Sequence, residues 1–78
     1  MTDLKETLYG IARAIVDHPD EVTVLENEGS REVNLTLSVA DSDMGMVIGK
    51  NGKIAKAIRT VMKAAAATDG KRVNVEIK

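Results

Sequence analysis

The sequence predicts an α+β fold in which a three-stranded sheet carries helices on one face. Two patterns support this prediction. Apolar residues recur at three- and four-residue spacing where helices are expected, and they alternate with polar residues where strands are expected. The order along the chain is helix, strand, strand, short helix, long helix, strand. Because each strand has one polar face, we expect helices on one side of the sheet and water or a partner on the other.

The first helix is expected over residues 2–16, because apolar side chains recur there at helical spacing. These side chains belong to Leu4, Leu8, Ile11, Ala12 and Ile15. Thr2 and Asp3 can cap the start of this helix. Pro19 ends it, since the residue before a proline, here His18, is pushed out of the α region.

Two strands should follow and pair as a hairpin. Val22 and Val24 begin the first extended segment, and the sequence Asn-Glu-Gly-Ser at residues 27–30 is typical of a turn. Residues 33–39 then alternate strictly between apolar and polar side chains, which is typical of a half-buried strand. The same alternation returns in residues 73–77, which are expected to form the third strand. We expect simple solvation for the polar face of the second strand, at Asn34, Thr36 and Ser38.

The remaining helices surround a pair of glycines. Asp41-Ser42-Asp43 is expected to start a short helix, with carboxylates where the helix dipole favours them, and Gly49 should end it. The long helix should begin at Asn51 or Gly52 and end at a C-terminal cap on Gly70. Its expected apolar positions are Ile54, Ala57, Ile58, Val61, Met62 and Ala65.

Length and composition exclude several classes of protein. The chain has 78 residues and is expected to form one domain over residues 1–78. It has no cysteine, which excludes disulfides and thiolate metal sites, and no apolar run near the roughly 20 residues that span a membrane. We therefore expect no membrane partner and no cofactor, and the lack of a signal-peptide pattern predicts a cytoplasmic location. Tyr9 is the only aromatic residue, which argues against modules that stack bases on aromatic platforms.

The formal net charge of −1 hides a strong asymmetry. Residues 1–43 carry three basic side chains against ten carboxylates, whereas residues 44–78 carry eight against two. Between Met44 and Thr68 there are five basic residues and no acid. This pattern favours a polyanionic partner for one face, with a merely solvated basic face as the alternative.

The segment Gly49-Lys50-Asn51-Gly52-Lys53 has the chemistry of a phosphate-binding turn. Gly49 can adopt the positive φ that ends a helix, and Gly52, which has no Cβ, allows another backbone to approach closely. The first amides of the following helix have no partner within it and lie at the positive end of its dipole. Lys50 and Lys53 add full charges, so we expect a phosphodiester ligand, with a plain helix–helix turn as the alternative. The spacing excludes a Walker A loop and a dinucleotide fingerprint.

An aliphatic residue before Gly-x-x-Gly between two helices, here Ile48-Gly49-Lys50-Asn51-Gly52, resembles the GXXG loop of KH domains. The order α-β-β-α-α-β resembles the type II KH arrangement, and the resemblance covers essentially the whole chain, including residues 16–19 and 54–59. It is similar in particular to short bacterial proteins with a single KH domain. That resemblance implies a cytoplasmic RNA-binding protein or RNA chaperone that forms homodimers, pairs with a larger KH-domain protein, and serves cell elongation and envelope synthesis.

Single-stranded RNA is therefore the expected partner. Phosphate contacts are expected from the lysines at and just after the turn, whereas Lys63, further along the same helix stripe, should be solvated. The aliphatic residues flanking the turn should line a groove for unstacked bases. Many KH domains carry a large aliphatic residue where this chain has Ala55, so we expect the preceding isoleucine to point partly outward, towards bases or a second copy. The expected RNA-binding residues are Ile48, Gly49, Lys50, Asn51, Gly52, Lys53, Ile54 and Lys56.

Two other functions are weighed against this one. In the first, the chain is a protein-interaction subunit whose dimer face includes Ile54, and RNA is bound only in a complex with the larger KH partner. The second is DNA binding through a helix-turn-helix. Arg59 is the one side chain of the long helix suited to reading base edges, so this hypothesis has little support.

No enzyme activity and no metal site are expected. His18 stands alone beside a proline and is interpreted as a turn residue. Asp41 and Asp43 are interpreted as helix-start carboxylates, because the further positions of a calcium loop are missing. Ser42 has only His18 as a partner base, and nothing in the sequence places the two together. Asp17, Asp20 and Glu21 are expected to form a solvated loop.

Overall fold

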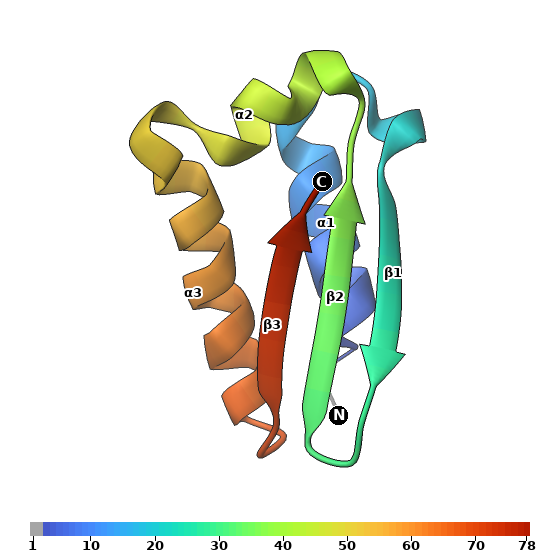
Figure 1. The fold of residues 1–78 in the computed structure, drawn as a ribbon, viewed down its shortest axis with the longest axis vertical. Helices are drawn as coiled ribbons and strands as arrows, with labels where there is room; N and C mark the ends of the chain where they lie inside the picture. Colours follow the sequence, from blue (N-terminus) through green and yellow to red (C-terminus); the bar gives the residue numbers. More distant parts are fainter. Residues whose placement is uncertain (1–2) are drawn as a thin grey trace.

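The computed structural model of the chain describes residues 3–78 and follows the expected order of elements (Figure 1). Its helices and strands are α1 (Leu4–Ile15), β1 (Thr23–Glu28), β2 (Glu32–Ser38), α2 (Met44–Ile48), α3 (Lys53–Ala67) and β3 (Arg72–Ile77). Short 3₁₀ turns cover Pro19–Glu21, Asp41–Asp43 and Lys50–Gly52. Among the residues described, no helix is long and apolar enough to cross a membrane.

The three strands lie in the order β1-β2-β3. β1 and β2 form the expected antiparallel hairpin, while β3 runs parallel to β2, with Leu35 opposite Val75. A parallel pair needs a crossover connection, and α2 and α3 supply it. In Figure 1 the sheet is seen from its open face, with α1 behind it and α3 beside β3. The prediction of helices on one face is confirmed, and the free edge of β3 faces the side where α3 lies.

The core lies between the apolar face of the sheet and the helices. β2 contributes Val33, Leu35 and Leu37, which are fully buried, and α1 contributes Leu4, Leu8 and Ala12 as expected. The buried face of α3 is narrower than its predicted apolar positions, because Ala57 and Val61 remain exposed. The apolar arc of α3 is wider than the face that packs onto the sheet, so one flank is left uncovered. The buried residues of α3 are Ala55, Ile58, Met62 and Ala66.

Helix ends follow local chemistry. Asp3 caps α1 by accepting a hydrogen bond of 3.1 Å from the backbone N–H of Glu6, while the expected contribution of Thr2 lies outside the described residues. α1 ends at Ile15, before the proline. The cap at Gly70 is confirmed: its φ is +68°, and the N–H of Lys71 donates to the carbonyl of Ala66 over 3.1 Å.

Candidate nucleic-acid interface

The turn between α2 and α3 depends on a close contact at Gly49. This residue has φ +74° and ψ 173°, a backbone conformation that is open essentially to glycine alone. A Cβ placed on Gly49 would lie 2.3 Å from Cγ1 and 2.9 Å from the backbone nitrogen of Ile54. Gly49 therefore ends α2 as predicted, and its missing side chain also allows the first turn of α3 to fold back onto it.

Gly52 has a different role from the one expected. Its φ is +73°, but nothing lies within 4 Å of the position of an added Cβ. The expected close backbone approach at Gly52 is therefore wrong, because that approach occurs at Gly49. Gly52 adopts a left-handed conformation, which glycine does without strain, and Asn51 is also left-handed, at φ +58°. Since these two residues turn the chain, α3 begins at Lys53 rather than at Asn51 or Gly52.

The turn presents positive charge at the start of a helix of 15 residues. Lys50, Asn51 and Lys53 are exposed, and Lys56 follows one turn later on the same helix. The N–H of Gly52 donates to the carbonyl of Gly49, over 3.2 Å. The dipole of α3 points its positive end at this surface, so the arrangement favours an anion.

The two isoleucines beside the turn are half exposed, at 39% for Ile48 and 38% for Ile54. The expectation that Ile54 points partly outward is confirmed, and Ala55 takes the buried place instead. Ile54 also lines an apolar hollow of ≈ 330 Å³ between α1 and α3. We call this hollow the α1–α3 patch; it is formed by Ile11, Ile15, Ile54, Ala57, Ile58 and Val61.

A second hollow runs between α3 and the free edge of β3. Arg59 anchors it, because its Nε donates to the carbonyl of Val75 over 3.2 Å. Lys63 is exposed, as expected for a solvated side chain, yet it also lines this hollow. The sequence contains part of this pattern, since Lys53, Lys56, Arg59 and Lys63 lie three or four residues apart on one stripe of α3. The hollow, of ≈ 230 Å³, is lined by Arg59, Lys63, Val73, Asn74 and Val75, and we call it the α3–β3 groove.

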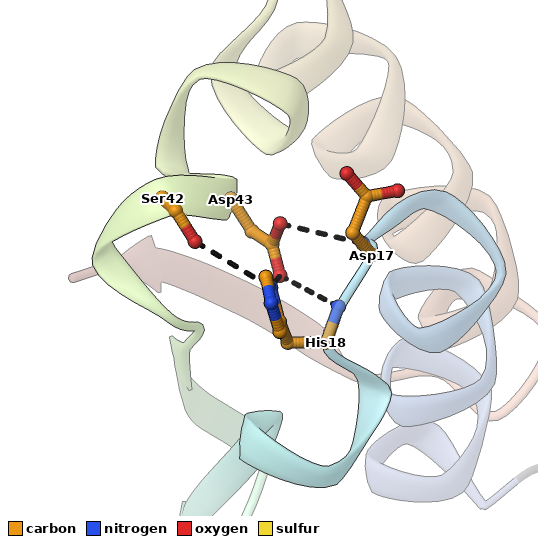
Figure 2. A network of polar contacts seen from close by, with 4 residues as sticks. All are labelled: Asp17, His18, Ser42 and Asp43. Carbon is orange, nitrogen blue, oxygen red and sulfur yellow. Dashed lines mark hydrogen bonds and ion pairs between the residues drawn. The ribbon is translucent and has the colours of Figure 1, made fainter.

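Asp43 is the buried acid of the described chain, and Figure 2 shows the contacts around it. Only 1% of it is exposed, and its Oδ1 accepts from the N–H of Asp17 over 3.3 Å. Its Oδ2 accepts from the N–H of His18 over 2.9 Å and lies 3.2 Å from the His18 Nδ1. Asp43 stands at the start of α2, as expected, but its side chain caps no amide of that helix. Asp43 instead joins the loop after α1 to the head of the helix that leads into the glycine turn.

The same contacts bring Ser42 and His18 together, which the sequence did not suggest. Ser42 Oγ lies 3.4 Å from the His18 Nδ1, the nitrogen that also contacts Asp43 (Figure 2). A catalytic triad uses the two ring nitrogens separately, one for the acid and the other for the serine. Because both partners meet one nitrogen here, the cluster cannot relay a proton and is a structural cap.

The hydrogen bonds of this cluster favour the ionised form of the Asp43 side chain. Burial alone raises the pKa of the Asp43 carboxyl, but the backbone N–H groups of His18 and Asp17 and the His18 side chain outweigh it. The net result is a pKa below the ordinary range for aspartate. Asp43 is therefore a carboxylate in the folded chain near neutral pH.

Comparison with known proteins identifies the arrangement. The family model described as "KhpA/KhpB, KH domain" matches residues 5–77. The RNA-binding protein KhpA of Clostridium acetobutylicum is 58% identical over 74 residues, covering 95% of this chain and 99% of the relative. The protein of the same name from Bacillus subtilis is 46% identical over 79 residues, covering 99% and 98%. These matches confirm the predicted KH fold and agree with the prediction that the chain is not an enzyme.

The two glycines of the turn should respond differently to alanine. Gly52→Ala should cost about 1–2 kcal/mol of unfolding free energy, because an L-residue is strained in the left-handed region but meets no atom there. Gly49→Ala should cost about 3 kcal/mol or more, because it adds a collision with the Ile54 backbone. Urea unfolding followed by circular dichroism measures both values. Equal costs would contradict the close contact at Gly49.

Asp43→Asn should destabilise the chain in a pH-dependent way. At pH 6 it should lower the melting temperature by about 5 °C or more, since an amide cannot replace both acceptor oxygens. A depressed pKa gives stability that is present above the unfolded value of about 4 and lost as pH falls through the folded value. The difference between the two proteins should therefore shrink as the pH falls below about 4.

Thermal melts over that pH range provide the measurement, and Asp41→Asn is the matched control. Asp41 precedes Asp43 by two residues in the same 3₁₀ turn, but it is exposed. Its replacement should change the melting temperature little at any pH. If the difference in melting temperature between wild type and Asp43→Asn stayed constant down to pH 2, ionised Asp43 would stabilise the fold no more than protonated Asp43.

Proposed function

Because the chain belongs to the KhpA/KhpB family of KH-domain proteins, we propose that it binds single-stranded RNA at the turn formed by residues 49–52. One observation carries the proposal. The glycine-only backbone of Gly49 lets the turn fold against Ile54, which leaves Lys50 and Lys53 exposed where α3 begins. A phosphodiester can then meet backbone amides, the helix dipole and two ammonium groups at one place.

The bases are held differently from the phosphates. Tyr9 is the only aromatic residue and lies on α1, so stacking on aromatic rings does not contribute. Unstacked bases instead contact the half-exposed Ile48 and Ile54 and enter the α3–β3 groove, where the free edge of β3 offers backbone hydrogen-bonding groups. Duplex RNA fits less well, because a paired strand does not expose its base edges to such a groove.

The cellular role proposed is that of a cytoplasmic RNA chaperone or post-transcriptional regulator. The relatives compared above carry the name RNA-binding protein, which supports this class of function. No stripe of asparagine, glutamine and arginine follows α3, so major-groove DNA reading is disfavoured. The link to cell elongation and envelope synthesis stays a prediction from family resemblance.

A second candidate function is supported by the α1–α3 patch. Its side chains are entirely apolar, and Val61, which lines it, is 50% exposed. An exposed apolar patch on so small a protein is typical of an interaction surface. We propose a second copy of this chain as its occupant, or the larger KH partner that the family description KhpA/KhpB supports. Such pairing also increases RNA affinity, since two modest sites on one strand act at high effective concentration.

The double variant Lys50→Asp with Asn51→Asp tests the RNA site. It makes the turn three charges more negative while keeping both glycines, and aspartate tolerates the left-handed conformation of residue 51. Affinity for a single-stranded RNA oligonucleotide should fall at least about tenfold, as measured by fluorescence anisotropy. The wild-type slope of log affinity against log salt should be roughly −2 to −3, for three or four phosphate contacts.

Lys5→Asp is the control for nonspecific charge, because Lys5 is exposed on α1. It should leave affinity within about twofold, because Lys5 lies on α1, outside the turn and the α3–β3 groove. Circular dichroism should show an unchanged fold for both proteins. Full binding by the double variant would exclude the turn as the contact.

Val61→Asp tests the interaction surface. It places a charge in the α1–α3 patch without touching Gly49, which Ile54→Asp would disturb. Sedimentation velocity should show the wild type as a dimer and Val61→Asp as a monomer. Thr60→Asp, one residue away and exposed, should remain dimeric. A wild type that stays monomeric at high concentration would leave the patch for the larger KH partner alone.

A further inference from the structure

The largest hollow among those described lies on the open face of the sheet, at the end where the β1–β2 hairpin turns. Its volume is ≈ 630 Å³, and the residues that line it include Asn27, Arg31, Glu32, Asn34 and Arg72. We call it the hairpin hollow. In Figure 1 the hairpin and the loop from α3 to β3 lie together at the lower end, whereas the glycine turn lies at the other end of α3.

Two arginines, Arg31 and Arg72, line this hollow. The backbone N–H of Arg72 donates to the carbonyl of Arg31 over 2.9 Å, so the two side chains leave from adjoining points of the backbone. Both residues are exposed, and no ion pair joins either of them to a carboxylate within residues 3–78. Exposed, unpaired arginines are well suited to phosphate, because the planar guanidinium fork can bind two oxygens at once.

The acidic side chains near the hollow already have hydrogen-bond or ion-pair partners. Glu32 lines it, but its Oε1 accepts from the Asn74 Nδ2 over 3.1 Å. The same amide donates to the Asn34 Oδ1 over 2.9 Å, which holds three polar side chains in a fixed row. Glu28, at the hairpin, is paired with Lys71. The two arginines therefore outnumber the single acid that lines the hollow, and ordered amides lie beside them.

The hairpin hollow is continuous with the proposed RNA site. A smaller hollow of ≈ 240 Å³ lies between them and is lined by Lys63, Lys71, Arg72, Val73 and Asn74. It shares Lys63 with the α3–β3 groove and Arg72 with the hairpin hollow. A basic path thus leads from the glycine turn along α3, for ~22 Å of helix, and round the start of β3.

We propose that the hairpin hollow is a second phosphate subsite, which takes the continuation of an RNA strand held at the glycine turn. Arg72 and Arg31 bind its backbone, and the amides of Asn27 and Asn34 face the adjoining sugar or base. The polar sheet face is then partly a binding surface, rather than simply solvated. This inference rests on the proposed function, since the same strand must occupy the turn. An acidic protein segment fits the arginines but gains nothing from the continuous path to the turn.

The test compares oligouridylates of 4, 8 and 12 nucleotides with Arg31→Gln/Arg72→Gln. The double variant should bind the 4-mer within about twofold of wild type and the 12-mer about tenfold more weakly. Its salt slope on the 12-mer should be smaller in magnitude by about 1.4, for two lost phosphate contacts. Arg13→Gln, which removes an arginine lying over Tyr9 on α1, should change neither affinity. Circular dichroism verifies the fold of each variant.

A measurement on the wild type makes the result independent of the variants. The NMR amide signals of Arg31 and Arg72 should shift with the 12-mer and stay unchanged with the 4-mer, which should move only the turn. The second subsite would be overturned if the double variant lost the same affinity for the 4-mer and the 12-mer, or if the amide signals of Arg31 and Arg72 did not shift with the 12-mer. Neither result would contradict binding at the turn. A wild type that binds no oligonucleotide would refute the proposed function itself. If polyglutamate shifts these arginines and the 12-mer does not, the hollow is a protein site and the proposal fails.

Discussion

The contact between Gly49 and the first turn of α3 is the constraint on which the candidate interface depends. Because no side chain separates Gly49 from Ile54, α3 can begin immediately after the turn, and its amide end faces outward. The same contact pushes Ile54 to the surface and gives Ala55 the buried position. One missing methyl group therefore decides where the charges, the helix dipole and one aliphatic wall of the interface lie.

The short helix before the turn, α2, also has to be held in position, and the Asp43 side chain does this. α2 has only five residues and buries little besides Val47, so packing alone holds it weakly. The Asp43 carboxylate, at the head of this helix, accepts two backbone amides from the loop after α1. A short helix is thereby tied at one end to α1 and ended at the other by Gly49. The low pKa of Asp43 follows from this structural role rather than from catalysis.

The net charge of the chain says little about its surface, because the fold brings basic residues from different segments together on one side. The basic stripe of α3 lies beside the free edge of β3, since β3 pairs in parallel with β2. The loop before β3 then brings Lys71 and Arg72 to the end of that stripe, next to the hairpin. Of the acids close to this loop, Glu28 is paired with Lys71, and Glu32 accepts a hydrogen bond from Asn74. A chain that is slightly acidic overall can thus carry a basic surface along α3 and the start of β3.

The sequence by itself determined the order of elements, the alternating strands, the caps at Asp3 and Gly70 and the position of the glycine turn. Each of these depends on neighbours within a few residues, so periodicity and residue type suffice. The packing of α3 that leaves Ala57 and Val61 exposed, the Asp43–His18 contact and the grouping of Arg31 with Arg72 could not be predicted. They join residues far apart in the chain, and their geometry follows from helix packing and strand pairing, which local patterns do not encode.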